Sequence, residues 1–348
     1  MLPEEIGLLN SRISSGKVFQ LDGRPMTTTL EKALICASNT YIYPVINDII
    51  ILLKDLALAP SLDTVVTGLM DKDKHWVKDF YDQEGWLTDK TGFYTDAIIY
   101  EDLRDVSKEY IRKCHQRVSR YLVPSGKYFL DAASGAIQYP EYLEYSARYD
   151  YRICVDFSFQ ALMEARKKLG SKGICILCDI VNLPFRDDSI DCFASLHTIY
   201  HIPKTQQVKA VQELYRSLRA GGKGVMVYDW YKHSRWMNLY LLPFRGFVFV
   251  KNRLMEVTQI MFRGKSTKGR LYFYAHTLRY FRKHLPPFQL KVWRSVSVPF
   301  MHYYIHPRLF GKQLLEWFYR QEEKAPERCG INGEYPLMVF EKEAAGNA

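Results

Sequence analysis

The chain lacks an apolar run long enough to cross a membrane. A membrane-spanning helix needs about 20 consecutive apolar residues. The two most apolar stretches, residues 43–59 and 237–250, are interrupted by charged residues, and the second also by Pro243. The first residues lack the basic start of a signal peptide, since Glu4 and Glu5 stand there. From these absences we expect a globular protein of the cytoplasm.

Cysteine is too sparse and too unevenly spaced to suggest disulfides or a metal site. The seven cysteines are an odd number, and several fall in predicted core strands, so we expect reduced thiols. Cys175 and Cys178 form a single C-x-x-C motif, but no second pair follows at zinc-binding spacing. We therefore predict no bound metal.

Acidic residues are nearly absent from residues 230–320. This region has 17 Lys and Arg residues against only Glu256 and Glu316, a local charge of +15, whereas the whole chain carries +10. The region is also rich in aromatic residues. The 348 residues are 47% hydrophobic and 25% charged, which is the composition of a folded protein of one large domain or two. The excess positive charge is thus confined to one segment, and such a segment favours an anionic partner.

A small accessory region is predicted over residues 1–60. Residues 45–46 and 49–53 are rich in β-branched side chains and are separated by Asn47 and Asp48. Two such runs around a two-residue polar turn indicate a β-hairpin.

A linker and cap are predicted over residues 61–99, followed by one helix over residues 100–122. Apolar strands then alternate with helices, which predicts a mostly parallel sheet covered on both faces. The predicted strands are residues 128–131, 152–156, 174–178, 190–195 and 224–228, and the predicted helices are residues 139–148, 158–169 and 205–219.

An inserted helical lid is predicted over residues 230–274, with apolar helices at residues 237–250 and 254–262. The remainder completes the sheet with two further strands. The predicted elements are a helix at residues 275–284, a strand at 288–298, a helix at 309–320 and a strand at 336–341.

Three successive predicted strands end on an aspartate, namely Asp131, Asp156 and Asp179. Ligands of such sheets bind at the carboxyl ends of the strands. An acid roughly 20 residues after the first turn suits the hydroxyl groups of a ribose. The first turn holds only Gly135 of the three glycines that many nucleotide-binding turns carry, so a dinucleotide is the weaker alternative. A nucleotide-containing ligand is therefore expected at this edge.

In these residues the chain resembles the class I S-adenosylmethionine-dependent methyltransferase family. Residues 129–135 are similar to its first motif, residues 154–158 to its ribose-binding strand end and residues 178–185 to its adenine-contacting segment. Residues 191–197 resemble its fourth strand, and residues 213–224 resemble the helix and glycine turn before its fifth.

The resemblance implies an α/β fold with a seven-stranded Rossmann-like sheet, formed by residues 100–229 and 275–342. It also implies S-adenosyl-L-methionine as the cofactor. Asp156 would hold the ribose and Phe157 would lie against the adenine, while Asp179 and the Ile180 N–H would bond to it. The implied cofactor-binding residues are Asp131, Ala133, Ser134, Gly135, Asp156, Phe157, Ser158, Asp179, Ile180, Ser195 and Leu196.

A second resemblance covers only residues 34–53. These residues are similar to the small zinc-ribbon-like domain that activates, or is fused to, some methyltransferases. Members that bind zinc do so with paired cysteines, and only Cys36 is present here, so such a domain would be free of metal. A generic β-hairpin is an equally open interpretation.

Catalysis of methyl transfer requires alignment first, and a base only where the nucleophile carries a proton. His197 and His201 lie in the loop after the fourth strand and are candidate bases, with Tyr200 as a further candidate. Structural roles for the two histidines remain open. Asp229 and Tyr231 are candidates of second rank for a catalytic role.

The basic, aromatic lid is compatible with three kinds of acceptor. A small or lipid-like anionic molecule held by Arg and Lys ranks first. Peripheral docking on an anionic membrane to reach a lipid-linked acceptor ranks second. RNA ranks third, because no known RNA-binding module is visible. A cofactor-binding subunit without catalysis is the competing class, and the sequence sets no oligomeric state.

Overall fold

The computed structural model describes most of the chain after residue 91 and shorter pieces before it. The described residues are 18–21, 24–27, 32–35, 42–53, 56–57, 85–87, 90, 92–246 and 272–343. Among the helices in these ranges, none combines the length and the hydropathy needed to cross a lipid bilayer.

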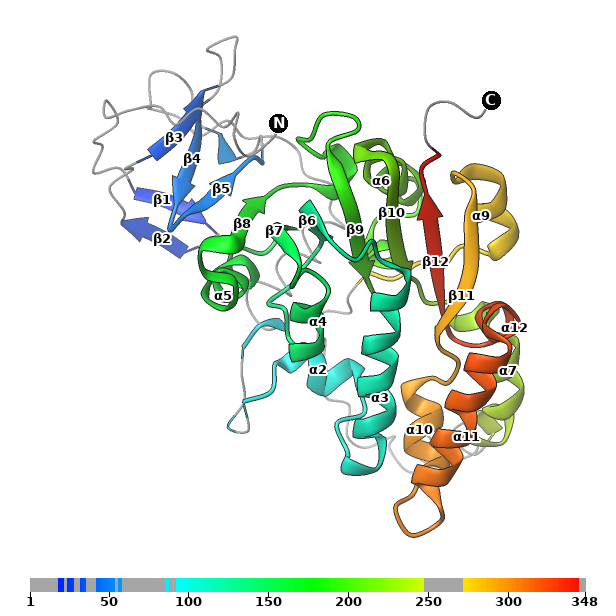
Figure 1. Cartoon of the computed structure of the whole chain (residues 1–348). Helices are drawn as coiled ribbons and strands as arrows, with labels where there is room; N and C mark the ends of the chain where they lie inside the picture. Colours follow the sequence, from blue (N-terminus) through cyan, green and yellow to red (C-terminus); the bar gives the residue numbers. More distant parts are fainter. Residues whose placement is uncertain are drawn as a thin grey trace, which may run out of the picture.

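One ten-stranded sheet runs through the molecule in the order β11-β12-β10-β9-β6-β7-β8-β5-β4-β3 (Figure 1). Strands β6 to β10 pair in parallel, and β12 is antiparallel to both of its neighbours. These seven strands, β6 to β12, are the predicted ones, so the α/β fold is confirmed. Their bounds are β6 Gly126–Ala132, β7 Tyr149–Asp156, β8 Gly173–Leu177, β9 Ile190–Leu196, β10 Leu218–Val227, β11 Phe288–Arg294 and β12 Tyr335–Glu341.

The sheet has three strands more than predicted, because the N-terminal region extends it beyond β8. β5 (Ile49–Ile51) pairs in parallel with β8, and β4 (Ile42–Ile46) and β3 (Lys32–Ile35) continue the sheet antiparallel. Asn47 and Asp48 connect β4 to β5 with φ angles of 51° and 59°, which confirms the predicted hairpin.

The zinc-ribbon-like resemblance is not confirmed. Cys36, on which the comparison with metal-binding members depended, lies outside the described residues. The other described N-terminal strands, β1 (Val18–Leu21) and β2 (Arg24–Thr27), form a separate two-stranded sheet.

Helices cover both faces of the sheet, because the side chains of its strands alternate between two apolar layers. Leu214 on α6 and Phe281 on α9 pack on one face. Tyr110 on α3 and Leu162 on α5 pack on the other, where α10 and α11 also lie. The bounds are α3 Asp105–Arg117, α4 Pro140–Glu144, α5 Phe159–Leu169, α6 Gln207–Ser217, α9 Leu278–His284, α10 Val298–Tyr304, α11 Gly311–Lys324 and α12 Pro326–Asn332.

The helix predicted over residues 100–122 begins later than expected. α3 starts at Asp105 and a 3-10 turn continues it over Val118–Tyr121, whereas α2 (Thr95–Tyr100) is a separate helix, and the backbone at Glu101 and Arg104 is extended. The buried Asp102 carboxylate accepts hydrogen bonds from the Arg104 guanidinium, at 2.7 Å, and from the Ser107 hydroxyl. These polar contacts, together with an ion pair of Glu101, favour a break over a continuous helix.

The predictions for the second half need further corrections. The strand predicted over residues 288–298 ends at Arg294, and Ser297 caps α10 by accepting a hydrogen bond from the Phe300 N–H at 3.3 Å. Neither α10 nor α12 was predicted. Within the predicted lid, α7 (Arg235–Tyr240) overlaps the start of the helix predicted over residues 237–250, and the helix predicted over residues 254–262 lies outside the described residues.

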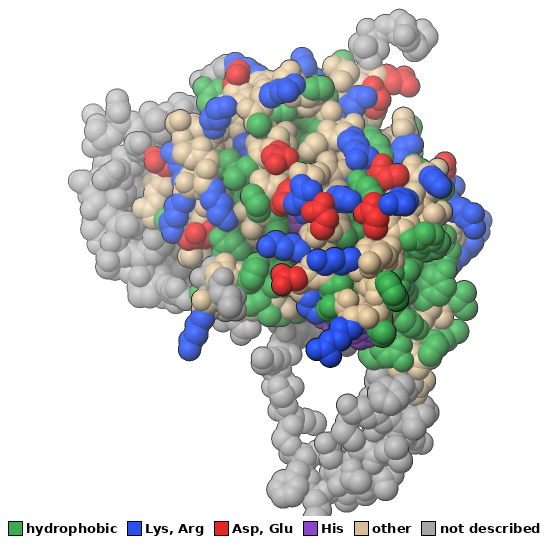
Figure 2. Space-filling view, turned by 60° about the horizontal axis from the view of Figure 1, so that its bottom comes forward, with side chains coloured by type: hydrophobic (Ala, Val, Ile, Leu, Met, Phe, Trp, Pro, Cys, Tyr) green, Lys and Arg blue, Asp and Glu red, His purple; other side chains and the backbone are tan. Residues whose placement is uncertain are grey.

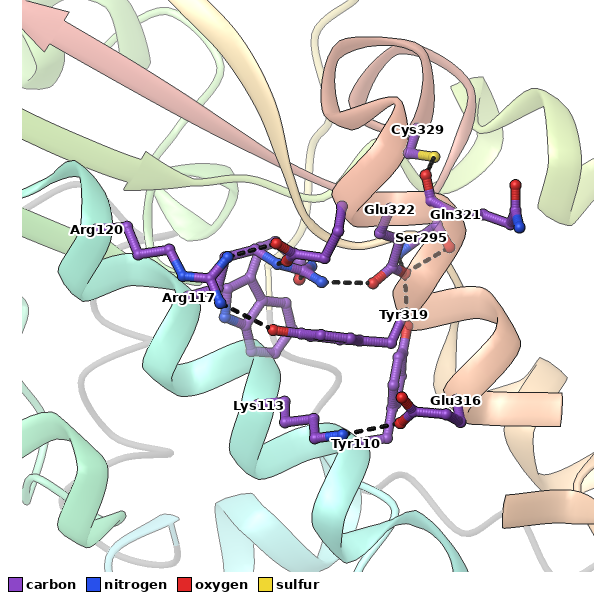
Figure 3. A network of polar contacts seen from close by, with 12 residues as sticks. Tyr110, Lys113, Arg117, Arg120, Ser295, Glu316, Tyr319, Gln321, Glu322 and Cys329 are labelled. Atoms are coloured by element: carbon purple, nitrogen blue, oxygen red, sulfur yellow. Dashed lines mark hydrogen bonds and ion pairs between the residues drawn. The ribbon is translucent and has the colours of Figure 1, made fainter. Parts of the chain in front are cut away.

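A buried polar network anchors α3 and α11 to the end of β11 (Figure 3). Glu322 accepts hydrogen bonds from Arg117 Nη2 at 2.9 Å and from the Ser295 N–H at 2.8 Å. Arg117 also donates to the Trp293 carbonyl at 2.5 Å. Because these contacts flank Arg294 on both sides, they hold that arginine at the edge of the sheet.

Candidate functional site

A cavity of about 1140 Å³ lies at the carboxyl edge of the parallel strands. The residues that follow β6, β7, β8, β9 and β10 meet there because these strands run in the same direction. Residues of α2, α10, the end of β11 and the start of β12 complete its walls. The predicted cofactor residues that line it are Asp131, Ala133, Ser134, Gly135, Asp156, Phe157, Asp179, Ile180 and Leu196.

The turn after β6 has an unusual backbone. Ala133, Gly135 and Ile137 have φ angles of 56°, 54° and 50°. This left-handed conformation is strained for residues other than glycine, above all for a β-branched one. A Cβ atom on Gly135 would lie 2.3 Å from the ring of Trp86. The turn therefore needs glycine at this position, and Trp86 packs against it from the cap segment.

Asp156, at the end of β7, is directed at the same turn. Its Oδ2 accepts a hydrogen bond from the Gly135 N–H, and its Oδ1 accepts one from the Ser158 N–H, both at 2.8 Å. Burial raises the pKa of Asp156 to about 6, although these N–H donors act in the opposite direction. A carboxylate held by the backbone and open to a cavity is well placed to bind hydroxyl groups.

Asp179 and Ile180 follow β8 at the next position along the edge. The Asp179 carboxylate accepts a hydrogen bond from the Val181 N–H at 2.9 Å, which fixes the start of the following turn. Ser158 and Ser195, in contrast, are not among the lining residues. Ser158 caps α5 by accepting from the Ala161 N–H at 3.2 Å, and Ser195 is buried within β9. Their roles in cofactor binding stay predictions.

Asp131, at the end of β6, forms a buried ion pair with Arg152 on β7. Arg152 Nε lies 3.0 Å from Asp131 Oδ2, and Arg152 also donates to the Tyr142 carbonyl at 2.5 Å. The charge of Asp131 is thus balanced within the fold. The family resemblance implies that Asp131 either orients this turn or pairs with the ammonium group of the cofactor, and the internal ion pair favours the first role.

The candidate bases His201 and Tyr200 line the cavity. His201 Nδ1 lies 2.7 Å from the Tyr272 carbonyl oxygen, so Nδ1 carries the proton. Burial lowers the pKa of His201 to about 4. The Tyr200 ring is buried, with centroid distances of 4.5 Å to His201 and 5.0 Å to Phe273.

His197 also lines the cavity, with its backbone in the left-handed region at φ 58°. Its ring lies 4.4 Å from the Trp293 ring and 5.5 Å from the Tyr335 ring. Burial and the neighbouring Arg294 cation lower the pKa of His197 well below its usual range. Both histidines are therefore weak proton acceptors near neutral pH.

Sequence reasoning missed a second cluster of polar residues that lines the same cavity. Its members come from four distant segments and are Glu101 after α2, Asp229 after β10, Arg294 at the end of β11 and Glu334 before β12. Among the candidate catalytic residues predicted from the sequence, Asp229 ranked only second, although it directly follows the predicted strand at residues 224–228. Arg294 and Glu334 gave no local signal, since only the pairing of β10, β11 and β12 brings them together.

The predicted lid contributes Tyr231, Phe244 and Phe273 to the lining. Six of its Lys and Arg residues fall within residues 247–271, which lie outside the described part of the chain. The lid as a basic acceptor-binding element therefore remains a prediction.

Comparisons with known proteins identify methyltransferases as similar sequences. The family model described as "Methyltransferase domain" matches residues 130–226. The curated protein "Probable tRNA methyltransferase 9B" of Homo sapiens is 36% identical over 70 residues, which are 20% of this chain and 15% of that protein. "Methyltransferase GfsG" of Streptomyces halstedii is 26% identical over 167 residues, which are 44% of this chain and 58% of that protein. The chain thus matches only part of the length of either relative.

Among solved structures, geranyl diphosphate C-methyltransferase from Streptomyces coelicolor is similar with a TM-score of 0.46 and 12% sequence identity. The alignment covers 78% of this chain and 98% of that one.

Proposed function

We propose that the chain is a class I S-adenosylmethionine-dependent methyltransferase that transfers a methyl group from S-adenosyl-L-methionine to a small acceptor, since residues 130–226 match a methyltransferase family model. The observation that carries this proposal is the convergence of three strand-end acids and the Gly135 turn on one cavity. The volume of about 1140 Å³ exceeds what one drug-sized ligand fills and leaves room for a cofactor and an acceptor side by side.

The donor groups of the site fit the proposed cofactor. Asp156 would hold the ribose hydroxyls, and the turn at residues 133–135, which lines the cavity, would lie beside the methionine part. Asp179 and the Ile180 N–H would contact the adenine. When bound, the cofactor supplies an electrophilic methyl group. The protein's own contribution is then to hold the acceptor in line with that methyl group and to exclude water.

A small acceptor is favoured over RNA by the way the cavity is covered. Its walls include Trp86 and residues of α2 and α10. RNA methylation remains the second candidate, since 70 residues match a protein named as a probable tRNA methyltransferase and since residues 230–320 are strongly basic. A non-catalytic cofactor-binding subunit remains the third.

Peripheral membrane docking is retained as a proposal for the exposed apolar side chains just before α11. Hydrophobic side chains gather on the lower right of Figure 2, whereas charged side chains of both signs mix over the rest of that face. Leu309 and Phe310, before α11, are 67% and 75% exposed, and Arg308 and Lys312 flank them. Co-sedimentation with anionic and with neutral vesicles tests this surface.

Calorimetric titration with S-adenosylhomocysteine tests the proposed function directly. The wild type should bind, and Asp156→Asn should bind at least about tenfold more weakly, because the carboxylate is lost without a change of shape. Asp150→Asn, an exposed aspartate on the same strand, is the matched control and should bind normally. Absence of binding to the wild type would overturn the methyltransferase proposal.

A further inference from the structure

The polar cluster of Glu101, Asp229, Arg294 and Glu334 lies at the other end of the sheet edge from the proposed cofactor groups. The cofactor groups follow β6, β7 and β8, whereas Asp229, Arg294 and Glu334 stand at β10, β11 and β12. Backbone hydrogen bonds place these last three segments side by side. The Trp230 N–H donates to the Glu334 carbonyl at 2.9 Å, and the Glu334 N–H donates to the Ser295 carbonyl at 3.0 Å.

The cluster contains more acid than its single cation can balance. Glu101 forms a buried ion pair with Arg294, and this pair leaves Asp229 and Glu334 without an equivalent partner of opposite charge among the described residues. Among the described residues that line the cavity, Arg294 is the only lysine or arginine. Buried carboxylates without a counter-charge are costly, which marks them as binding groups rather than supports.

Two polar atoms of the cluster are buried and have no hydrogen-bond partner in the described part of the chain. They are Glu334 Oε2 and Arg294 Nε. Glu334 is 6% exposed and Arg294 is 1% exposed, and both line the cavity. Buried polar atoms without a partner indicate that a ligand supplies the missing hydrogen bonds. Glu334 Oε2 in particular needs a hydrogen-bond donor.

The proton affinities agree with this geometry. Burial raises the pKa of Asp229 to about 7, and burial together with the charge of Asp229 raises the pKa of Glu334. A base works best when its pKa lies near the operating pH. Asp229 meets this condition, whereas His197 and His201, with lowered pKa values, do not.

We propose that this acidic cluster is the acceptor site and that the acceptor is an amine, bound as its ammonium form by Asp229 and Glu334. The inference rests on the proposed methyltransferase function and concerns only its substrate class. It departs from the anionic acceptor expected from the basic segment, because the charges that face the cavity are acidic. Aromatic rings in the same lining suit a cation as well; they are Tyr100, Tyr231, Phe244, Phe273, Tyr303 and Tyr335.

The chemical step balances with the groups named. The ammonium gives one proton to the Asp229 carboxylate and becomes a neutral amine. The nitrogen lone pair then forms a bond to the methyl carbon, and the carbon–sulfur bond breaks with its electron pair remaining on sulfur. The product is an N-methylammonium ion and a neutral thioether, and the proton on Asp229 later leaves to solvent.

Calorimetry with three probes of matched shape tests the inference on protein saturated with S-adenosylhomocysteine. The probes are phenethylamine, 2-phenylethanol and 3-phenylpropionate, which share a phenylethyl body but carry a cationic, a neutral and an anionic head. We expect the amine to bind at least about tenfold more tightly than the alcohol and the carboxylate to bind most weakly. Asp229→Asn and Glu334→Gln should each lose most of this preference, and Asp150→Asn should keep it.

The readouts separate the two proposals. If S-adenosylhomocysteine binds but the alcohol or the carboxylate binds as tightly as the amine, the amine inference is overturned and the methyltransferase proposal stands. The amine inference is also overturned if both cluster variants keep the preference. Retained binding of S-adenosylhomocysteine by the two variants shows that they are folded.

Discussion

Glu101 and Arg294 form a buried ion pair across 193 residues of sequence. Glu101 ends the segment that carries α2, and Arg294 ends β11, so the pair connects the cap to the edge of the sheet. Arg294 also lies over the rings of Trp293 and Tyr335, at 4.8 Å and 4.7 Å from their centroids. The cap is thereby held over the cavity by a charge on the sheet itself.

Removal of Glu101 should destabilise the protein strongly. Glu101→Ala leaves the Arg294 guanidinium buried without its counter-charge, and we expect the free energy of unfolding to fall by about 3–5 kcal/mol. Urea denaturation measures this loss. Glu109→Ala breaks an exposed pair with Arg112, at 2.8 Å, and should cost less than about 1 kcal/mol. Equal losses for both variants would contradict the importance of the buried pair.

In the turn after β6, position 133 should tolerate glycine, whereas position 135 should not tolerate alanine. Gly135→Ala places a Cβ atom against the Trp86 ring in a backbone at φ 54°, so we expect weaker binding of S-adenosylhomocysteine and a lower melting temperature. Ala133→Gly relieves a φ of 56° and should change the stability by less than about 1 kcal/mol. Calorimetry and thermal melts measure both variants. A harmless Gly135→Ala would argue against close packing of Trp86 on the turn.

Cofactor binding should weaken in acid because of Asp156. Its pKa is raised to about 6, so the carboxylate that is to accept hydrogen bonds from a ribose becomes protonated below that pH. We expect the affinity for S-adenosylhomocysteine to fall between about pH 7 and about pH 5. Asp156→Asn should bind weakly and without this pH dependence. A wild-type affinity that is constant over the same range would contradict the assignment.

Stability at neutral pH should increase when Asp229 loses its charge. The pKa of Asp229 is about 7 in the folded protein against 3.8 for an ordinary aspartate, so wild-type stability falls through this group as pH rises from 4 to 7. Asp229→Asn keeps an oxygen that can accept from the Tyr231 N–H and removes the buried charge. We expect a gain of up to about 4 kcal/mol at about pH 8 and little gain at about pH 4.

Thermal melts at both pH values measure the effect, with Asp150→Asn as the exposed control. Arg294 and Glu334 are the charged groups that interact most directly with Asp229, and Glu334→Gln should shift stability in the same direction. A loss of stability for Asp229→Asn at about pH 8 would show that the carboxylate supports the fold instead of serving the site.

Local sequence pattern was sufficient for the central sheet and for the strand-end acids that line the cavity. The β-branched and apolar runs of β6 to β10 are buried on both faces, so their composition alone identifies them. Asp156 and Asp179 follow such runs directly, and parallel strands must present their ends at one edge. The hairpin at Asn47 and Asp48 was predictable for a similar reason, because the residues that form its turn and its two strands are neighbours in the sequence.

The polar cluster of Glu101, Asp229, Arg294 and Glu334 depends on contacts between residues far apart in the chain. Asp102 makes local contacts with Arg104 and Ser107 at the helix break, but the ion pair of Glu101 with Arg294 spans 193 residues, and nothing near Glu334 in sequence indicates a cavity wall. Only the antiparallel pairing of β12 with β10 and β11 brings Asp229, Arg294 and Glu334 to one place. Local sequence therefore determines the strand ends and their acids, whereas tertiary packing determines which charges are buried together at Asp229, Arg294 and Glu334.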